Sequence, residues 1–282
     1  MDSLTRIDAH QHFWRFDEAE YGWITPEMAV LRRDHLPGDL EPQLEQAGLH
    51  GSVAVQARQT LEEMRWLLQL AERHDFIRGV VGWVDLCDPD VERILEGFAG
   101  RAKLAGVRHV LQDEPDRRYM LREDFLRGIG TLARFNLAYD ILIYAHQLPE
   151  ALELVRLFPQ QRFVLDHMAK PLIRDGILQP WEQNIRALAA HSNLYCKLSG
   201  LVTEADLNRW HTSDFRPYLD VVFDAFGPGR LMLGSDWPVC TLAGSYTRVI
   251  NIVLDYLAGF DQKDRRAVLG LNAIEFYGLQ SE

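Results

Sequence analysis

The sequence predicts a single α/β domain in which eight strand–helix units close into a TIM-type (β/α)8 barrel. The chain has 282 residues, close to the roughly 250 that one such barrel takes. Short apolar runs alternate with longer amphipathic segments along the whole chain, which is typical of parallel strands joined by helices. No linker rich in Gly, Ser or Pro interrupts this alternation, so we expect one domain over residues 1–282.

Eight apolar runs are the candidate strands of this barrel. Several are apolar at almost every position, such as GVVGWV and LAYDILIY, which is typical of parallel strands buried on both faces. Eight such units in one chain favour a closed barrel over an open sheet. In chain order the candidate strands are Leu4–Ala9, Gly51–Gln56, Arg78–Val84, Ala105–Leu111, Leu137–Tyr144, Arg162–Asp166, Asn193–Leu198 and Arg230–Ser235.

Amphipathic segments between these strands are the candidate helices. The clearest is Thr60–His74, where Thr60 stands at the N-cap position and Glu63 follows at capping-box spacing. The irregular segment Phe13–Leu36 follows the first strand, where a barrel carries a loop that covers the substrate. The other helices are Asp39–Ala47, Asp90–Ala102, Glu123–Phe135, Pro149–Phe158, Pro180–His191, Phe215–Phe226, Ser245–Leu257 and Lys263–Phe276.

Charge and composition argue against nucleic acids and membranes as partners. Lys and Arg number 30 and Asp and Glu 41, which gives a net charge of −11 and disfavours anionic polymers and lipids. No apolar stretch reaches the roughly 20 residues of a membrane helix, and no signal-peptide pattern opens the chain. The cysteines, Cys87, Cys196 and Cys240, form no disulfide or CxxC pattern. We therefore expect a cytoplasmic protein that acts on a small molecule.

Two histidines at the end of the first strand are the first candidate for chemistry. His10 and His12 are two residues apart, so both side chains point to the same side of a strand. At the carboxyl end of a barrel strand that side is the catalytic mouth. There the imidazoles can bind a metal ion or polarise a carbonyl group.

Three further residues follow apolar strands at the same end of the barrel. Asp236 follows the eighth strand in LMLGSDWP and can serve as a metal ligand or as a general base for water. His167 follows the sixth strand and can donate a hydrogen bond to a developing oxyanion. His146 follows the fifth strand, where it is either a site residue or a hydrogen-bonded loop histidine. These residues converge only if the strands close into a barrel.

Other residues are candidates for contacts with a substrate. Trp14 and Trp237 lie next to strand ends and can form an apolar wall for a ligand. Gln112 ends the fourth unit in VRHVLQDEPD, where it can recognise sugar hydroxyl groups. Lys197 lies inside an apolar strand, which costs free energy unless the charge is paired, so it indicates either a buried ion pair or a substrate contact. The role of Asp166, which is either structural or orients a neighbour, stays open.

Five segments of the chain resemble the amidohydrolase superfamily in its amidohydrolase 2 branch. They are IDAHQHFW at 7–14, GVRHVLQDEPD at 106–116, FVLDHMAKP at 163–171, CKLSGL at 196–201 and LMLGSDWPV at 231–239. Within this branch they are similar to the sugar-lactone lactonases, such as L-fuconolactonase and L-rhamnono-lactonase. The resemblance covers nearly the whole chain and implies a distorted (β/α)8 barrel, a role in carbohydrate metabolism and hydrolysis of a ring ester.

The resemblance also implies a set of site residues. In metal-dependent relatives one divalent ion, often zinc, is held by the residues that match His10, His12, His146 and Asp236. Some lactonases of this branch are similar but need no metal. Because Lys197 is on the wrong strand to be carbamylated as a bridge between two metals, we expect a mononuclear or a metal-free site.

The expected mechanism is attack of water on the lactone carbonyl. Asp236 takes the proton of the water, and His10, His12 and His167 stabilise the tetrahedral oxyanion. Two alternatives within the superfamily remain open. One is a metal-dependent decarboxylase, and the other is a pyrone-dicarboxylate lactonase, whose two carboxylates would need cations such as Arg58, Arg108 and Lys197. A non-catalytic sugar-binding barrel is a third alternative.

Overall fold

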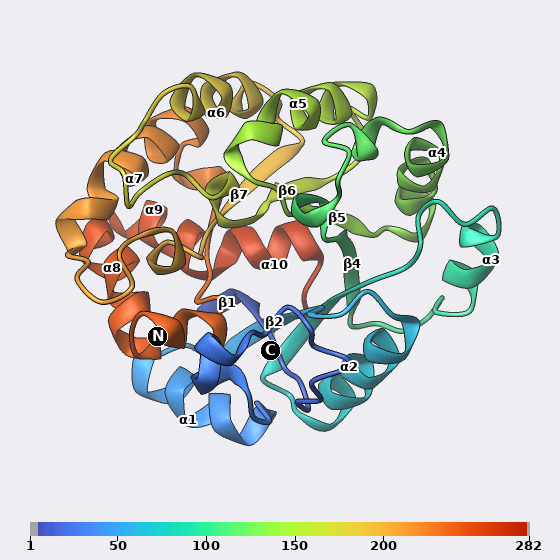
Figure 1. The fold of residues 1–282 in the computed structure, drawn as a ribbon, viewed down its shortest axis with the longest axis horizontal. Helices are drawn as coiled ribbons and strands as arrows, with labels where there is room; N and C mark the ends of the chain where they lie inside the picture. The colour runs from blue at the N-terminus through green and yellow to red at the C-terminus, as the bar shows by residue number, and fades with distance from the viewer. Residues whose placement is uncertain (1–4, 281–282) are drawn as a thin grey trace.

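The computed structural model describes residues 5–280, and in this range eight parallel strands follow one another around a barrel (Figure 1). The predicted fold is confirmed. The first predicted strand begins at Leu4, which lies outside the described residues. The strands are β1 (Ile7–Gln11), β2 (Gly51–Val55), β3 (Ile77–Gly82), β4 (Leu104–His109), β5 (Ala138–Ile141), β6 (Phe163–Leu165), β7 (Leu194–Leu198) and β8 (Leu231–Leu233).

The barrel closes where the carboxyl ends of β1 and β8 meet. Gln11 and Trp237 form a parallel bridge between the two strand ends. The backbone N–H of Asp236 donates to the carbonyl of His10 at 2.8 Å, and the N–H of His12 donates to the carbonyl of Trp237 at 2.7 Å. Backbone hydrogen bonds therefore join two of the predicted site segments, although more than two hundred residues separate them in the chain.

Helices surround the strands on the outside of the barrel (Figure 1). In α2, the Thr60 hydroxyl accepts from the backbone N–H of Glu63, as the capping pattern predicts. Within residues 5–280, no helix combines the length and the apolar character needed to cross a bilayer. The helices are α1 (Pro37–Ala47), α2 (Leu61–Arg73), α3 (Val91–Glu96), α4 (Glu123–Leu132), α5 (Leu148–Leu157), α6 (Trp181–Ala189), α7 (Thr212–Phe226), α8 (Tyr246–Tyr256), α9 (Gln262–Arg266) and α10 (Asn272–Tyr277).

Two helices differ from the sequence prediction. The helix predicted over Asp90–Ala102 ends at Glu96, and the chain then passes through Gly100, whose φ of +85° is unfavourable for other residues. The helix predicted over Lys263–Phe276 is divided into α9 and α10 by a π-helical turn. A Cβ at Gly270 in this turn would lie 2.1 Å from the carbonyl oxygen of Thr5, so the glycine allows the last helices to pack against the chain entering β1.

The helix α10 closes the amino-terminal end of the barrel. Its residues Phe276 and Tyr277 pack against apolar side chains from inside the barrel, such as Val53, Val164 and Met232. Figure 1, viewed down the short axis, shows α10 crossing the middle of the ring of strands. The carboxyl-terminal half of the interior is therefore left for polar residues.

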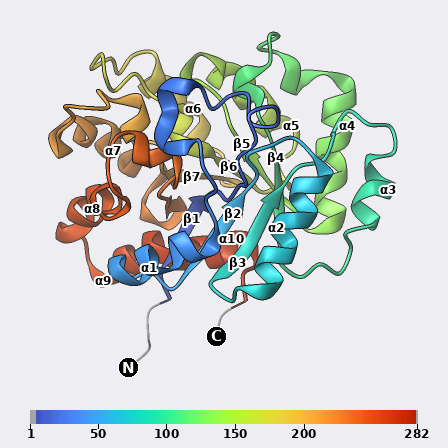
Figure 2. The same cartoon turned by 60° about the horizontal axis from the view of Figure 1, so that its bottom comes forward.

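The segment predicted as a covering loop, Phe13–Leu36, lies over the carboxyl ends of the strands. It contains a 3-10 helix, Pro26–Leu31, and an antiparallel bridge between Trp14 and His35. Figure 2 shows this segment, coloured blue, arching over the barrel on the side opposite to the chain termini. Its predicted location at the carboxyl ends of the strands agrees with the structure.

Candidate active site

Three of the predicted residues meet at the seam between β1 and β8. The Nε2 atoms of His10 and His12 are 3.2 Å apart. The Oδ1 atom of Asp236 lies 3.3 Å from Nε2 of His12 and 3.8 Å from Nε2 of His10. All three side chains are buried. The sequence prediction that the DAHQH and GSDWP segments converge therefore agrees with the geometry.

These three side chains fit a single zinc ion. Tetrahedral zinc has ligand distances of roughly 2.0–2.2 Å, which places neighbouring ligand atoms roughly 3.3–3.5 Å apart. The three distances in the cluster of His10, His12 and Asp236, at 3.2, 3.3 and 3.8 Å, span that range. A second group with metal-ligating atoms consists of His10, Asp166 and His167. Asp166 already contacts two cationic side chains, as described below, so the first group is better suited to an ion.

Hydrogen bonds set the orientation of both rings in the His pair. Nδ1 of His12 lies 2.8 Å from the carbonyl oxygen of Val55, to which it donates. This leaves the Nε2 lone pair of His12 directed at Asp236. Nδ1 of His10 lies 3.3 Å from Oδ1 of Asp166, which is the contact that orients a metal-binding histidine and raises its basicity.

The third histidine, His167, sits next to this pair in an unusual backbone conformation. Its ring centroid is 4.4 Å from that of His10, and its Nδ1 lies 2.9 Å from the Ser199 hydroxyl. His167 and the next three residues all have φ between 50° and 58°, which costs about 1–2 kcal/mol per residue. Gly200 makes room for the ring, because a Cβ there would lie 2.6 Å from Nδ1 of His167.

Burial sets the charge of each group at the site. It lowers the pKa of His167 to about 4 and holds the pKa of His10 well below its usual value, so both rings are neutral at neutral pH. Burial alone would raise the pKa of Asp236, but the nearby His167, His12 and His10 outweigh it and lower that pKa. The site thus presents neutral imidazoles around one carboxylate.

The structure resolves the two alternatives for Lys197. Its side chain is 0% exposed, and Nζ lies 2.5 Å from Oδ2 of Asp140 and 3.1 Å from Oδ1 of Asp166. Lys197 therefore forms a buried ion pair and has no exposed surface with which to contact substrate. Asp166, whose role the sequence leaves open, is buried and lies 3.3 Å from Nδ1 of His10.

The remaining predicted substrate contacts lie in different surroundings. Trp14 is 0% exposed, with its indole N–H donating to the carbonyl oxygens of Leu31 and Arg33. Trp237 is also buried, against Phe13. Both tryptophans pack the covering loop and present no open wall.

Gln112 and His146 lie apart from the metal-binding groups. Gln112 is half-buried, and its Oε1 atom has no hydrogen-bond partner among the described residues. It therefore keeps an acceptor for a ligand hydroxyl. His146 is exposed and stacks on Tyr144, with ring centroids 6.0 Å apart. It belongs to neither metal-binding group of the described residues, so its expected role as a ligand gains no support.

The sequence suggested Arg108 only as a cation for a dicarboxylate substrate and did not place it beside His10. Its NH1 atom lies 3.3 Å from Nε2 of His10 and 3.0 Å from Oδ2 of Asp166. A signal was present in the sequence, because an arginine inside the apolar segment GVRHV needs a partner just as Lys197 does. What the sequence lacked was the identity of that partner.

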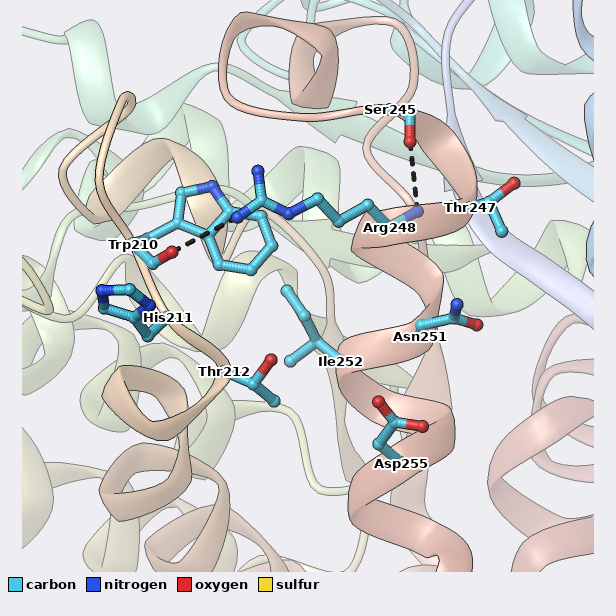
Figure 3. Close-up of a pocket in the computed structure, with 9 residues that line it drawn as sticks. All are labelled: Trp210, His211, Thr212, Ser245, Thr247, Arg248, Asn251, Ile252 and Asp255. Carbon is cyan, nitrogen blue, oxygen red and sulfur yellow. Dashed lines mark hydrogen bonds between the residues drawn. The ribbon is translucent and has the colours of Figure 1, made fainter.

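A separate cavity of about 490 Å³ lies between the beginning of α7 and one side of α8 (Figure 3). The Arg248 guanidinium lies over the Trp210 ring at 3.7 Å from its centroid. The lining residues are Trp210, His211, Thr212, Ser245, Thr247, Arg248, Asn251, Ile252 and Asp255. None of them belongs to the cluster around His10, so this cavity is not the candidate active site.

Comparison with known proteins links this geometry to one family. The sequence profile of the family described as amidohydrolase matches residues 7–279. The chain is 43% identical to an L-fucono-1,5-lactonase of Burkholderia multivorans, over 97% of this chain and 96% of that protein. It is 39% identical to an L-fucono-1,5-lactonase of Burkholderia ambifaria, over 96% and 95%. A crystal structure of an amidohydrolase from Burkholderia multivorans with bound zinc superposes with a TM-score of 0.94, at 42% identity over 98% of this chain and 100% of that one.

Proposed function

Because this chain belongs to the amidohydrolase family, we propose that it hydrolyses a sugar lactone, with L-fucono-1,5-lactone as the first candidate substrate. One observation carries the proposal: His10, His12 and Asp236 converge on a single point at the carboxyl end of the barrel. Two relatives, 43% and 39% identical to this chain over nearly their full length, are named for that activity.

We further propose that one zinc ion is held by His10, His12 and Asp236. The separations of their ligand atoms support this set, and the related crystal structure contains zinc. When bound, the ion acts as a Lewis acid toward the lactone carbonyl. His146 is left out of this set because its side chain is exposed and lies outside the cluster.

Asp236 is the proposed general base. Its lowered pKa keeps it ionised at neutral pH, so it can take a proton from the attacking water as the new C–O bond forms. When the bond between the carbonyl carbon and the ring oxygen breaks, Asp236 returns this proton to the leaving alkoxide. Water is consumed, the open-chain hydroxy acid forms, and Asp236 is again an ionised carboxylate.

His167 is the proposed hydrogen-bond donor to the oxyanion. Its neutral ring carries one proton, and Nδ1 lies 2.9 Å from the Ser199 hydroxyl. When Ser199 donates to Nδ1, the proton of the ring is on Nε2, from which it can be donated to the developing charge. Loss of one such donor typically lowers kcat by about 10²–10³.

The alternative of a pyrone-dicarboxylate lactonase is less well supported. The cations that two substrate carboxylates would need already have partners in this chain. Arg58 contacts Glu20, Arg108 contacts Asp166, and Lys197 is enclosed. A neutral lactone needs no such cations.

A panel of substrates tests the proposed function. Acid release is followed with a pH indicator for L-fucono-1,5-lactone, its 1,4-isomer, L-rhamnono-lactone and 2-pyrone-4,6-dicarboxylate, each with and without zinc and a chelator. We expect hydrolysis of the deoxy-sugar lactones and the lowest kcat/KM with the dicarboxylate. CO₂ release from an aromatic acid, with no turnover of any lactone, would overturn the proposal in favour of a decarboxylase.

We also propose that the protein acts in a reducing compartment such as the cytoplasm. Cys87, Cys196 and Cys240 are all free thiols, and burial raises the pKa of the Cys196 thiol, so it stays protonated and unreactive. Titration of accessible thiols before and after unfolding checks this, since only the unfolded chain should expose all three.

A further inference from the structure

Four charged side chains lie inside the barrel between α10 and the active site. They come from neighbouring strands: Arg108 from β4, Asp140 from β5, Asp166 directly after β6, and Lys197 from β7. Arg108 is 4% exposed and the other three are 0% exposed. We call these four residues the buried tetrad. None of them belongs to the set proposed above to carry out the reaction.

The tetrad is connected to His10 through Asp166. Oδ2 of Asp166 accepts from Arg108 at 3.0 Å, and Oδ1 lies 3.1 Å from Nζ of Lys197 and 3.3 Å from Nδ1 of His10. Both carboxylate oxygens are thus held by cations. The carboxylate can hardly rotate, so it fixes the direction in which Nδ1 of His10 donates.

At its other end the tetrad is connected to the last helix. The Tyr277 hydroxyl of α10 lies 2.8 Å from Oδ2 and 3.0 Å from Oδ1 of Asp140. Asp140 in turn binds Nζ of Lys197 at 2.5 Å, and this Nζ also lies 5.5 Å from the centroid of the Tyr277 ring. A continuous line of contacts therefore runs from Tyr277 through Asp140, Lys197 and Asp166 to His10.

Lys197 stands where it can change the proton arrangement of His10. Its Nζ lies only 3.2 Å from Nδ1 of His10. If Lys197 donated to Nδ1, the ring proton would have to be on Nε2, which faces His12, Asp236 and the NH1 group of Arg108 at 3.3 Å. Asp140, held by Tyr277, draws the ammonium group away from His10. With Nδ1 free to donate to Asp166, the Nε2 lone pair stays directed at the reaction site.

Stability alone does not account for the tetrad. Burying charges costs free energy, and well-packed apolar residues often serve a core equally well or better. The amino-terminal half of this barrel is filled in that way, by residues such as Ile7, Val53 and Met232. The tetrad instead forms one connected group of charges that reaches His10, which indicates a role in the site.

We propose that Tyr277 is a positioning residue: through Asp140 it keeps the ammonium group of Lys197 from donating to Nδ1 of His10, and so holds His10 in the tautomer with its Nε2 lone pair directed at the reaction site. The proposal rests on the proposed function for its kinetic consequence. The tautomer itself is a property of the metal-free protein and is measured without any substrate.

The test compares two variants that each remove one hydroxyl from a buried tyrosine. Tyr277→Phe removes the contact with Asp140. Tyr139→Phe is the matched control, because Tyr139 precedes Asp140 on β5, is equally buried and packs against Phe125 in the outer layer. Partners that orient metal-binding histidines are typically worth about 10–100-fold in activity. We expect kcat to fall about tenfold in Tyr277→Phe with KM unchanged, and both to be unchanged in Tyr139→Phe.

The second measurement is ¹⁵N NMR of the histidine rings in metal-free protein, with His10 assigned from the signal that is lost in His10→Asn. We expect the wild-type His10 Nε2 to have the shift of an unprotonated nitrogen, Tyr277→Phe to move that shift toward the protonated value, and Lys197→Met, which removes the competing donor, to keep the unprotonated shift. An unchanged shift in Tyr277→Phe, or a protonated shift in Lys197→Met, would overturn the proposal, as would equal loss of kcat in the Tyr139→Phe control. If the wild type hydrolyses no lactone, the proposed function is refuted. The NMR measurement would still test the tautomer of His10, because it needs no substrate.

Discussion

At the scale of single residues, backbone strain gathers where the chemistry is proposed. Asp236 has φ of 58°, and His167 has φ of 54°, in a region that side chains other than glycine, asparagine and aspartate rarely occupy. Such conformations persist where the surrounding structure enforces them, and they are common at active sites. Here the hydrogen bond from the Asp236 N–H to His10 holds the strained residue in place.

Replacing Asp236 by asparagine should remove the general base and leave the fold intact. Asparagine tolerates positive φ as well as aspartate does, so the substitution adds no backbone strain. We expect kcat to fall by about 10²–10⁴, with an unchanged circular dichroism spectrum. The control is Asp255→Asn, which removes an equal charge from an exposed position on α8. Wild-type turnover in Asp236→Asn would exclude this residue from the mechanism.

Two glycines with nearly identical φ angles allow the cost of backbone strain to be measured apart from the cost of a steric clash. Gly200 has φ of 64° and faces His167, whereas Gly176 has φ of 66° and no atom within 4 Å of an added Cβ. Alanine at Gly176 should cost only the conformational penalty of about 1–2 kcal/mol. Alanine at Gly200 should cost more and should also lower kcat, because the methyl group displaces His167. Urea unfolding and kcat of both variants check this, and equal losses would contradict it.

At the scale of elements, the beginning of α2 holds the loop that follows β2. The Glu63 carboxylate accepts from the backbone N–H groups of Ala57 at 3.0 Å and Arg58 at 2.8 Å. The capping pattern located the helix start correctly, but the side chain of Glu63 reaches back past Thr60 to the loop residues Ala57 and Arg58. Helix start and loop are therefore connected through a single buried carboxyl group.

The buried carboxyl group of Glu63 should make stability depend on pH. Burial raises its pKa from 4.5 to about 7, so the folded protein holds this proton more tightly than the unfolded chain does. Its contribution is complete below pH 4.5 and is lost as the pH rises through about 7. Relative to Glu63→Gln, we expect the wild type to lose on the order of 2–3 kcal/mol between pH 5 and pH 8.

Urea unfolding at the two pH values measures this difference for Glu63. Glu62→Gln is the matched control, because Glu62 is the exposed neighbour in the same helical turn. This control should retain the full pH dependence of the wild type. If Glu63→Gln retains it too, the titrating group lies elsewhere in the molecule.

At the scale of the whole molecule, the proposed zinc ligands come from the two strands that close the barrel. An ion held by His10 and His12 from β1 and by Asp236 after β8 would join the first and last strands of the fold. Metal binding should therefore stabilise the whole fold against unfolding, and not only the carboxyl end of the barrel.

Thermal unfolding tests this coupling between metal and barrel closure. Zinc at a hundredfold excess over its Kd should stabilise the protein by about 2.7 kcal/mol, which raises Tm by several degrees, at about 2–4 °C per kcal/mol for a chain of this size. Magnesium, which prefers oxygen ligands, should have no effect, and a chelator should reverse the shift. His12→Gln should not respond to zinc, and a full zinc response in that variant would move the metal site elsewhere.

Much of the site could be predicted because its residues follow strands that the sequence pattern reveals. The HxH pair after β1 and the Asp after β8 were placed at one end of the barrel from strand order alone. His146 shows where this reasoning stops. It also follows a strand, yet its side chain is exposed beside Tyr144, because the direction of a loop side chain depends on packing and not on its distance from the strand.

The buried tetrad could not be predicted for a related reason. Which strand residues face the interior depends on the register, and the pairs β1–β2, β2–β3 and β3–β4 each contain an irregularity that shifts it. The alternation of side chains between the two faces of a strand therefore does not predict that Arg108 points to Asp166. The left-handed turn that begins at His167 also has no sequence signal, since none of its four residues is a glycine or an asparagine.

The sequence by itself determined the eight strand–helix units, the end of the barrel that carries the site, and the residue types available there, because all three follow from local periodicity and strand order. Only the tertiary structure decided which charges become partners, which of the histidines converge, and how the last helix is connected to the first strand. Those relations depend on contacts between residues far apart in the chain, whose distances are settled when the barrel closes.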